Sequence, residues 1–252
     1  MRYLLLSDVH ANAVALEAVL EHASDKGWQQ VIFLGDAVGY YADAEGVIKT
    51  LQSLPLAVGL VGNHDAVLLR GEASASGRAL VNDILARQRR ELSADAKAFL
   101  ARLTPDARTT QWEAVHSTLA KTWDYVNTLE RALLERPRMT RDLLFFGHTH
   151  VAILYLFTEA ETPNGPQLLS RSVPLTRAQT VYRLPPKAQI MINPGSVGQP
   201  RDGVPLAAYA IFDEEARMLE HYRVPFDVRA VQKRLAQAGY PAELGTRLEW
   251  GR

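Results

Sequence analysis

The stretch MRYLLLSDVHANAVALEAVLEHASDKGWQQVIFLGD, residues 1–36, holds two short apolar runs on either side of a longer segment. In that segment apolar residues recur at helical spacing from Val14 to Leu20, and Gly27 ends the pattern. The flanking runs RYLLL and VIFL are almost continuously apolar, which is typical of strands covered on both faces. The stretch therefore predicts a β-α-β unit at the start of the chain.

Four later apolar runs also end in small or polar residues: PLAVGLVGN, EAVHS, DLLFFGH and AQIMINPGS. Residues 66–111 are rich in Ala, Arg and Leu at helical spacing and predict a helical insertion. Residues 123–137 predict another helix, and residues 151–224 an antiparallel meander or a second sheet. Residues 226–252 predict a C-terminal tail of two short helices. We expect a single domain over residues 1–252.

The composition limits the possible functions. A chain of 252 residues with 47% hydrophobic content can bury a substantial core. Its 28 basic and 28 acidic side chains cancel, so we expect neither general binding to nucleic acid nor attraction to a membrane surface. Cysteine is absent, which excludes disulfides and thiolate ligands and fits a reducing compartment. No run is long enough to span a bilayer, and the first run is too short for a secretory signal, so we expect a cytoplasmic protein.

Polar residues follow the predicted strands at their carboxyl ends. They are Asp8 and His10, Asp36, the trio Asn63, His64 and Asp65, then His116, and finally His148 and His150. In open α/β sheets the carboxyl edge is where loops converge on a ligand, so these side chains are expected to meet. Side chains two apart in an extended segment point the same way, so Asp8 with His10, and His148 with His150, should each form a two-pronged grip. Carboxylate, imidazole and amide ligands favour Mn²⁺, Fe, Zn²⁺, Co²⁺ or Ni²⁺ over Ca²⁺.

These residues form ordered motifs: Asp8-Val9-His10, Gly35-Asp36, Gly62-Asn63-His64-Asp65, His116 and Gly147-His148-Thr149-His150. In this order they resemble the motifs of the calcineurin-like metallophosphoesterase superfamily, over roughly residues 1–200. The segment NPGSVGQPR, residues 193–201, is similar to that of its compact bacterial phosphodiesterase branch. Five motifs in the right order on strand ends are far more specific than any of them alone.

The resemblance implies a four-layer α-β-β-α sandwich with two mixed β-sheets and two divalent metals. One metal would be held by Asp8, His10 and His150, the other by Asn63, His116 and His148, with Asp36 bridging them. A hydroxide between the metals would attack phosphorus in line. His64 would remain unligated and protonate or stabilise the leaving oxygen, and Asp65 would orient its ring.

Three residues have competing interpretations. His116 is followed by Ser-Thr-Leu and not by the glycine usual after this ligand, which weakens its assignment. Asn12 either caps the following helix, the interpretation we favour, or touches the phosphate. Arg201, in a loop with glycine and proline, either reaches the phosphate or lies on the surface.

Other polar residues match no motif. We expect His22 and His221 to be solvated, and the arginine cluster at residues 87–90 to form an exposed helix face. Tyr40 and Tyr41 follow the bridging aspartate and either line the mouth of the crevice or have no special role.

The sequence favours a binuclear metal-dependent phosphoesterase, most simply a phosphodiesterase on small or nucleotide-like substrates, with Mn²⁺ the expected activator in vitro. The alternatives are a phosphomonoesterase or protein phosphatase, and a non-catalytic binding protein on the same fold. The loop GDAVGYYAD, residues 35–43, favours diesters, because the related protein phosphatases carry an arginine there and this chain has none.

Overall fold

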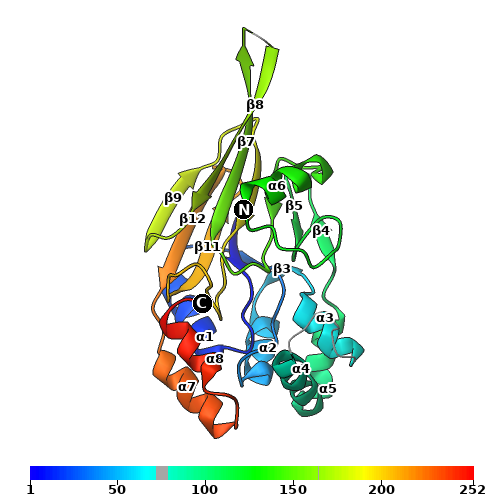
Figure 1. The fold of residues 1–252 in the computed structure, drawn as a ribbon, viewed down its shortest axis with the longest axis vertical. Coiled ribbons are helices and arrows are strands. Elements are labelled where there is room, and N and C mark those ends of the chain that lie inside the picture. Colours follow the sequence, from blue (N-terminus) through cyan, green and yellow to red (C-terminus); the bar gives the residue numbers. More distant parts are fainter. Residues whose placement is uncertain (72–78, 164) are drawn as a thin grey trace.

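A computed structural model describes residues 1–71, 79–163 and 165–252. Part of the expected insertion, residues 72–78, and one residue of the PNGP turn, residue 164, lie outside the described residues. Two six-stranded sheets stack face to face, and the β7–β8 hairpin extends well beyond the body of the molecule (Figure 1).

The first sheet has the order β3-β2-β1-β11-β12-β9. Its strands are β1 (Arg2–Leu6), β2 (Gln30–Phe33), β3 (Leu56–Gly59), β9 (Gln179–Arg183), β11 (Ala207–Asp213) and β12 (Met218–Val224). The strands β1, β2 and β3 are parallel, and β1 and β2 are joined by helix α1 (Ala13–Ala23). The predicted β-α-β unit at the start of the chain is therefore confirmed.

The second sheet has the order β4-β5-β6-β10-β7-β8. Its strands are β4 (Asp106–Arg108), β5 (Trp112–Val115), β6 (Leu143–Phe145), β7 (Ile153–Thr162), β8 (Gly165–Pro174) and β10 (Gln189–Asn193). Residues 151–224 do not form one meander, since β7, β8 and β10 join this sheet while β9, β11 and β12 join the other. Turn signals set local strand direction but not the sheet to which a strand belongs.

Alternation of side chains along the strands creates the layers. In β1, Leu4 and Leu6 face a core shared with helices, while Tyr3 and Leu5 face the core between the sheets. The outer face of the second sheet forms a third, smaller core with α6 (Leu129–Glu135). The four-layer α-β-β-α arrangement with two mixed sheets is thus confirmed.

The insertion is helical over most of its length. It contains α3 (Asn63–Arg70), α4 (Ala79–Glu91) and α5 (Ala94–Ala101), and it packs beside α2 (Ala44–Ser53). The expectation of helix up to residue 111 is wrong, because residues 106–108 pair with β5 as strand β4. The helix predicted over residues 123–137 is also too long. It begins only after Thr128, whose side chain accepts a hydrogen bond from Arg131 N.

The C-terminal tail forms the two predicted short helices, α7 (Val228–Gln237) and α8 (Glu243–Thr246), followed by a 3₁₀ turn (Arg247–Glu249). Arg234 of α7 forms an ion pair with Asp43 at 2.9 Å. Arg87 of the insertion lies over the Tyr240 ring at 4.8 Å and donates to the Ala238 carbonyl. Arg87 is therefore a half-buried contact between insertion and tail, whereas Arg89 and Arg90 are exposed as expected.

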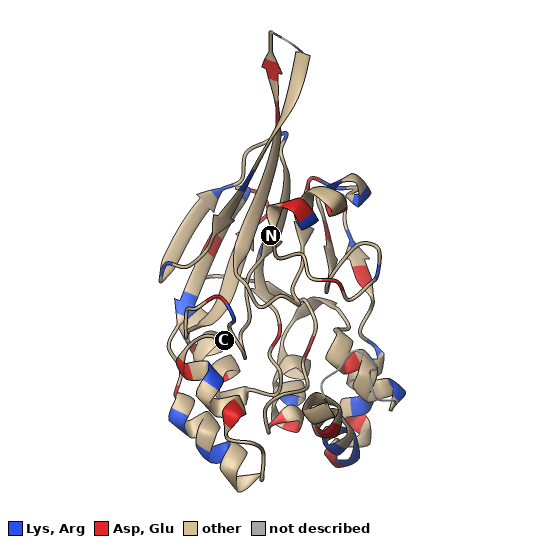
Figure 2. Cartoon of the chain, in the orientation of Figure 1, with Lys and Arg blue, Asp and Glu red and all other residues tan. Residues whose placement is uncertain are grey.

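Charged residues of both signs are interspersed along the outer helices (Figure 2). Among the described residues, no helix has the length and apolar character needed to cross a membrane.

Candidate metal centre

Loops at the carboxyl ends of the strands carry the candidate ligands in an uncommon backbone conformation. The φ angles are 53° at Asp8, 52° at His10, 60° at Asp36, 67° at His148 and 58° at His150, all in the left-handed region. Such conformations cost free energy in non-glycine residues and cluster at functional sites. The expected extended geometry of these segments is wrong, since sharp turns aim the side chains.

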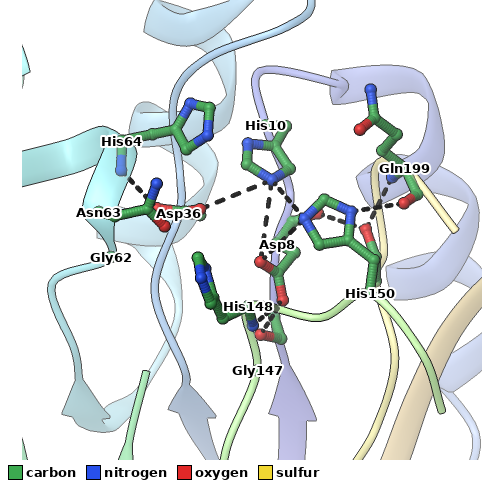
Figure 3. Close-up of polar contacts among 12 residues, drawn as sticks. Asp8, His10, Asp36, Gly62, Asn63, His64, Gly147, His148, His150 and Gln199 are labelled. Carbon is green, nitrogen blue, oxygen red and sulfur yellow. Dashed lines mark hydrogen bonds and ion pairs between the residues drawn. The ribbon is translucent and has the colours of Figure 1, made fainter. Parts of the chain in front are cut away.

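Asp8 lies at the centre of the first group of side chains (Figure 3). Its Oδ2 accepts hydrogen bonds from Ser7 Oγ at 2.6 Å and from His148 N at 3.0 Å. Its Oδ1 is buried and has no hydrogen-bond partner among the described residues. This oxygen lies 3.3 Å from His150 Nε2 and 3.8 Å from His10 Nε2. A buried carboxylate oxygen without a donor beside two imidazoles fits a cation site.

The histidines of this group present lone pairs to the same space. His10 Nδ1 lies 2.9 Å from the Val38 carbonyl, and His150 Nδ1 lies 2.6 Å from the Gln199 carbonyl. A carbonyl only accepts, so each Nδ1 carries the proton and each Nε2 has a free lone pair. This arrangement, in which a backbone carbonyl fixes the tautomer, is usual for metal-binding histidine.

The second group contains Asp36, His116 and His148. His116 Nδ1 donates to the Leu34 carbonyl at 2.7 Å, so its Nε2 points at the other members. That Nε2 lies 3.4 Å from Asp36 Oδ2 and 3.3 Å from Asn63 Oδ1. His148 donates through Nε2 to the Trp123 carbonyl at 2.9 Å, which leaves its Nδ1 lone pair for the group. The glycine missing after His116 does not displace this histidine from the group.

Asp36 joins the two groups, because its Oδ2 also lies 3.7 Å from His10 Nε2. The expected grip of His148 with His150 is wrong: His150 belongs with Asp8 and His10, and His148 with Asp36 and His116. A third combination of donor atoms within reach of one another is His10, Asp36 and His64. Apart from Asn63, which lies 3.3 Å from His116 Nε2, the two main groups match the two ligand sets that the family resemblance implies.

His64 and Asp65 do not interact in the expected way. The Asp65 carboxylate accepts hydrogen bonds from the backbone N–H groups of Asp36, Ala37, Val38 and Gly62, at 2.8, 2.9, 3.2 and 3.0 Å. It therefore shapes the loop that carries Asp36 and does not orient the His64 ring. His64 Nδ1 has no hydrogen-bond partner among the described residues. Gly39 leaves room for it, because a Cβ there would lie 2.3 Å from that nitrogen.

Most protonation states in the two groups suit cation binding. Burial by itself would raise the pKa of Asp8 and Asp36, but the neighbouring histidines outweigh it and lower both values. Burial lowers the pKa of His148 to about 4, with a smaller effect from His116. Burial also lowers the pKa of His10. Burial by itself would lower the pKa of His116, but Asp36 outweighs burial and raises that pKa to about 9, so a bound cation would displace a proton from His116. Ionised carboxylates and neutral imidazoles are the forms in which these side chains bind metals.

Two further residues were candidates for substrate contact. The Asn12 Oδ1 accepts from Ala15 N at 3.1 Å and its Nδ2 donates to the Gly198 carbonyl at 2.8 Å, which confirms the helix cap. Asn12 does not belong to the described lining of the main cleft. Arg201 does line that cleft, so the surface alternative for Arg201 is wrong. Its Nε and one Nη donate to Gln199 Oε1 at 3.0 and 2.6 Å.

The cleft beside the two groups has a volume of about 680 Å³, within the usual range of small-molecule sites. Its lining among the described residues is Tyr40, Asn63, His64, Val67, Arg70, Leu80, Val81, Asn82, Leu85, Trp123, Tyr125, His148, Arg201, Glu243, Leu244 and Arg247. The insertion supplies one wall and the C-terminal tail another. Tyr40 lines the mouth, whereas Tyr41 is buried and accepts from Gln199 Nε2.

Sequence reasoning missed several contributors. Ser7 and Gln199 hold Asp8 and His150 and stand next to or within quoted motifs, so they were within reach. Trp123, Tyr125 and Arg247 gave no signal, because only tertiary packing brings them to the cleft. His221, expected to be solvated, is buried and donates through Nε2 to the Pro194 carbonyl at 3.0 Å.

Fold and site together define a two-sheet sandwich protein with buried carboxylate and imidazole groups that could hold metal ions. The family model of the calcineurin-like phosphoesterase superfamily domain matches residues 1–217. The chain therefore belongs to the calcineurin-like phosphoesterase superfamily, whose members are metal-dependent phosphoester hydrolases.

Individual relatives agree with this family. The structure of a metallophosphoesterase from Sphaerobacter thermophilus is similar, with a TM-score of 0.84 and 31% identity over 100% of this chain and 99% of that one. A hypothetical protein from Pyrococcus horikoshii OT3 shares the fold, with a TM-score of 0.75 and 17% identity over 100% and 98%. An uncharacterized protein of Methanocaldococcus jannaschii is 28% identical over 98% of this chain and 97% of its own length.

Proposed function

We propose that this chain is a binuclear metal-dependent phosphodiesterase that acts on small or nucleotide-like substrates. The observation that carries the proposal is that Asp36 joins two buried donor groups, the first containing Asp8, His10 and His150 and the second His116 and His148. Asn63 completes the second group. These ligands favour Mn²⁺, Fe, Zn²⁺, Co²⁺ or Ni²⁺.

Bound metals supply a nucleophile at neutral pH and positive charge for the transferring oxygens. The chain supplies the rest. Asp8 and Asp36 fix the separation of the two groups, and Asp65 fixes the Asp36 loop through four backbone hydrogen bonds. His64 lines the cleft, and burial lowers its pKa to about 4, so its ring is neutral at pH 7. In our proposal its N–H donates a hydrogen bond to the leaving oxygen.

The preference for diesters has a geometric basis. No arginine stands between Gly39 and Tyr41. Arg201 does reach the cleft, but the Nε and Nη edge of its guanidinium already donates to Gln199. A dianionic monoester gains most from a bidentate arginine, so occupation of that edge penalises monoesters more than diesters.

The test compares three substrates with the Mn²⁺-loaded protein. We expect higher kcat/KM for bis-p-nitrophenyl phosphate than for p-nitrophenyl phosphate, and little activity on phosphoserine peptides. The three should be assayed at several concentrations, so that kcat and KM are separated. Preferential release of phosphate from the monoester or the peptides would overturn the diesterase assignment.

A further inference from the structure

The described residues that line the cleft beside the metal centre carry a net positive charge. Among the described lining residues are three arginines, Arg70, Arg201 and Arg247, and one carboxylate, Glu243. This excess is present before any metal is counted. A protein of zero formal net charge has therefore gathered positive charge at one cleft, which favours a ligand with more than one anionic group.

Two exposed aromatic rings also line the cleft. Trp123 is 42% exposed and Tyr125 is 48% exposed, and both line the cleft. The Tyr125 ring stacks on His148 with centroids 4.5 Å apart and planes 12° apart, while its other face is not covered by that contact. Large exposed aromatic side chains next to a binding centre are suited to stacking against a planar ring.

The loop that carries these rings is held by Ser117, which stands where the family has a glycine, and by Thr118. Thr118 Oγ1 donates to the Thr122 carbonyl at 3.0 Å, and Ser117 Oγ donates to the Asp124 carbonyl. Both hydroxyls immediately follow His116, so the departure from the family motif has a structural consequence. It fixes the loop that presents Trp123 to the cleft.

Arg201 and Arg247, together called the arginine wall, lie near the same tyrosine ring. The guanidinium carbons of Arg201 and Arg247 lie 5.3 and 6.0 Å from the centre of the same Tyr40 ring. Arg247 Nε donates to the Arg252 carbonyl at 2.9 Å, which keeps the side chain close to its own turn. Tyr40 also contacts His64, with ring centroids 4.9 Å apart. The two arginines thus lie close to the predicted catalytic histidine.

We propose that the substrate is a nucleotide carrying at least one phosphate beyond the reacting one, whose base stacks on Trp123 and Tyr125 and whose additional phosphate binds Arg247. The inference rests on the proposed phosphodiesterase function and names the substrate class of the same site. The aromatic wall lies beside His148 and the arginines beside Tyr40 and His64, so the reacting phosphate would lie between the two.

Three substrates with the same leaving group test this directly. They are methyl p-nitrophenyl phosphate, thymidine 5′-(p-nitrophenyl phosphate), and the 3′-phosphorylated form of the latter. The second adds a base and the third adds an anion. We expect KM to fall roughly 10-fold at each addition, the lower part of the range for base stacking and charge-assisted binding. Equal KM values for all three would overturn the proposal.

Two variants test which residues cause each decrease in KM. Trp123→Leu should abolish the KM difference between the first two substrates, and Arg247→Gln the difference between the last two. Matched controls are Trp250→Leu and Arg229→Gln, exposed residues of the C-terminal tail that do not line the cleft and should preserve both differences. If Arg247→Gln retains the preference for the 3′-phosphate, the assignment of the arginine wall is wrong.

A binding measurement separates this inference from the proposed function. Thymidine 3′,5′-bisphosphate should bind more tightly than thymidine 5′-phosphate, by calorimetry, and Arg247→Gln should remove the difference. If the binding preference is observed but none of the three substrates is turned over, the proposed function is wrong and the inferred binding site stands. Turnover without any binding preference would overturn only the inference.

Discussion

The Nε2 atoms of His10 and His150 lie 3.0 Å apart, and each ring uses its Nδ1 to donate to a backbone carbonyl. Two lone pairs therefore face each other beside the unpartnered Oδ1 of Asp8. Without a cation these three atoms repel one another in a buried place. The fold should consequently be more stable when metal is bound.

Removal of metal by a chelator should lower the melting temperature, and Mn²⁺ should restore it. Free metal at 100 times its Kd stabilises the folded state by about 2.7 kcal/mol. His150→Ala should weaken the response, whereas His22→Ala, at an exposed histidine, should not. A melting temperature that changes with neither chelator nor Mn²⁺ would argue against a metal centre.

His64→Ala should reduce kcat while both metals remain bound. A single well-placed donor to a developing charge contributes about 10²–10³-fold in kcat, which is the loss we expect. Steady-state kinetics and elemental analysis of the same sample provide the test. Loss of a metal from His64→Ala would instead make His64 a ligand, as its proximity to His10 and Asp36 allows.

Asp65→Asn should destabilise the fold and lower metal occupancy together. The new amide turns its own N–H groups toward backbone donors now bonded to the carboxylate, and each buried donor left unpaired costs about 1–3 kcal/mol. Denaturant unfolding measures the loss. Asp95→Asn, at an exposed carboxylate in the first turn of α5, should change the unfolding free energy little. Equal effects of the two substitutions would refute the role assigned to Asp65.

His221 should make stability depend on pH. Burial, with a smaller effect of Arg223, lowers the pKa of His221 from 6.5 to about 3. Between these pH values His221 binds a proton in the unfolded chain but not in the folded one. Its contribution to the free energy of unfolding is therefore complete above pH 6.5 and is lost as the pH falls toward 3. His221→Gln should flatten the pH dependence of unfolding in that window. Parallel curves for the two proteins would contradict it.

The parts of the site that could be predicted are those encoded locally. Asp8 and Asp36 follow the paired parallel strands β1 and β2 of the first sheet, and His148 follows β6 of the second. Each of these strands is short, apolar and buried, so the sequence marks its end. The relation of His64 to Asp65 was predicted wrongly for a local reason as well. Consecutive residues on a helix point about 100° apart, so adjacency in α3 separates the two side chains.

The remaining contributors depend on contacts between distant segments. Arg247 reaches the cleft because the tail docks on the body, for example through the ion pair of Arg234 with Asp43. Trp123 reaches it because hydroxyls after His116 shape a loop in which helix had been expected. Neither effect leaves a periodic pattern in the sequence, so only the structure reveals the walls of the cleft.

The central claim is a two-metal centre joined by Asp36. Anomalous diffraction from Mn²⁺-loaded crystals, together with the metal content of the same protein, tests it most directly. We expect two metal ions per chain, one among Asp8, His10 and His150 and the other among Asn63, His116 and His148, with Asp36 between them. Asp36→Asn should lower the occupancy of both. A single peak, or full occupancy of both positions in Asp36→Asn, would contradict the account.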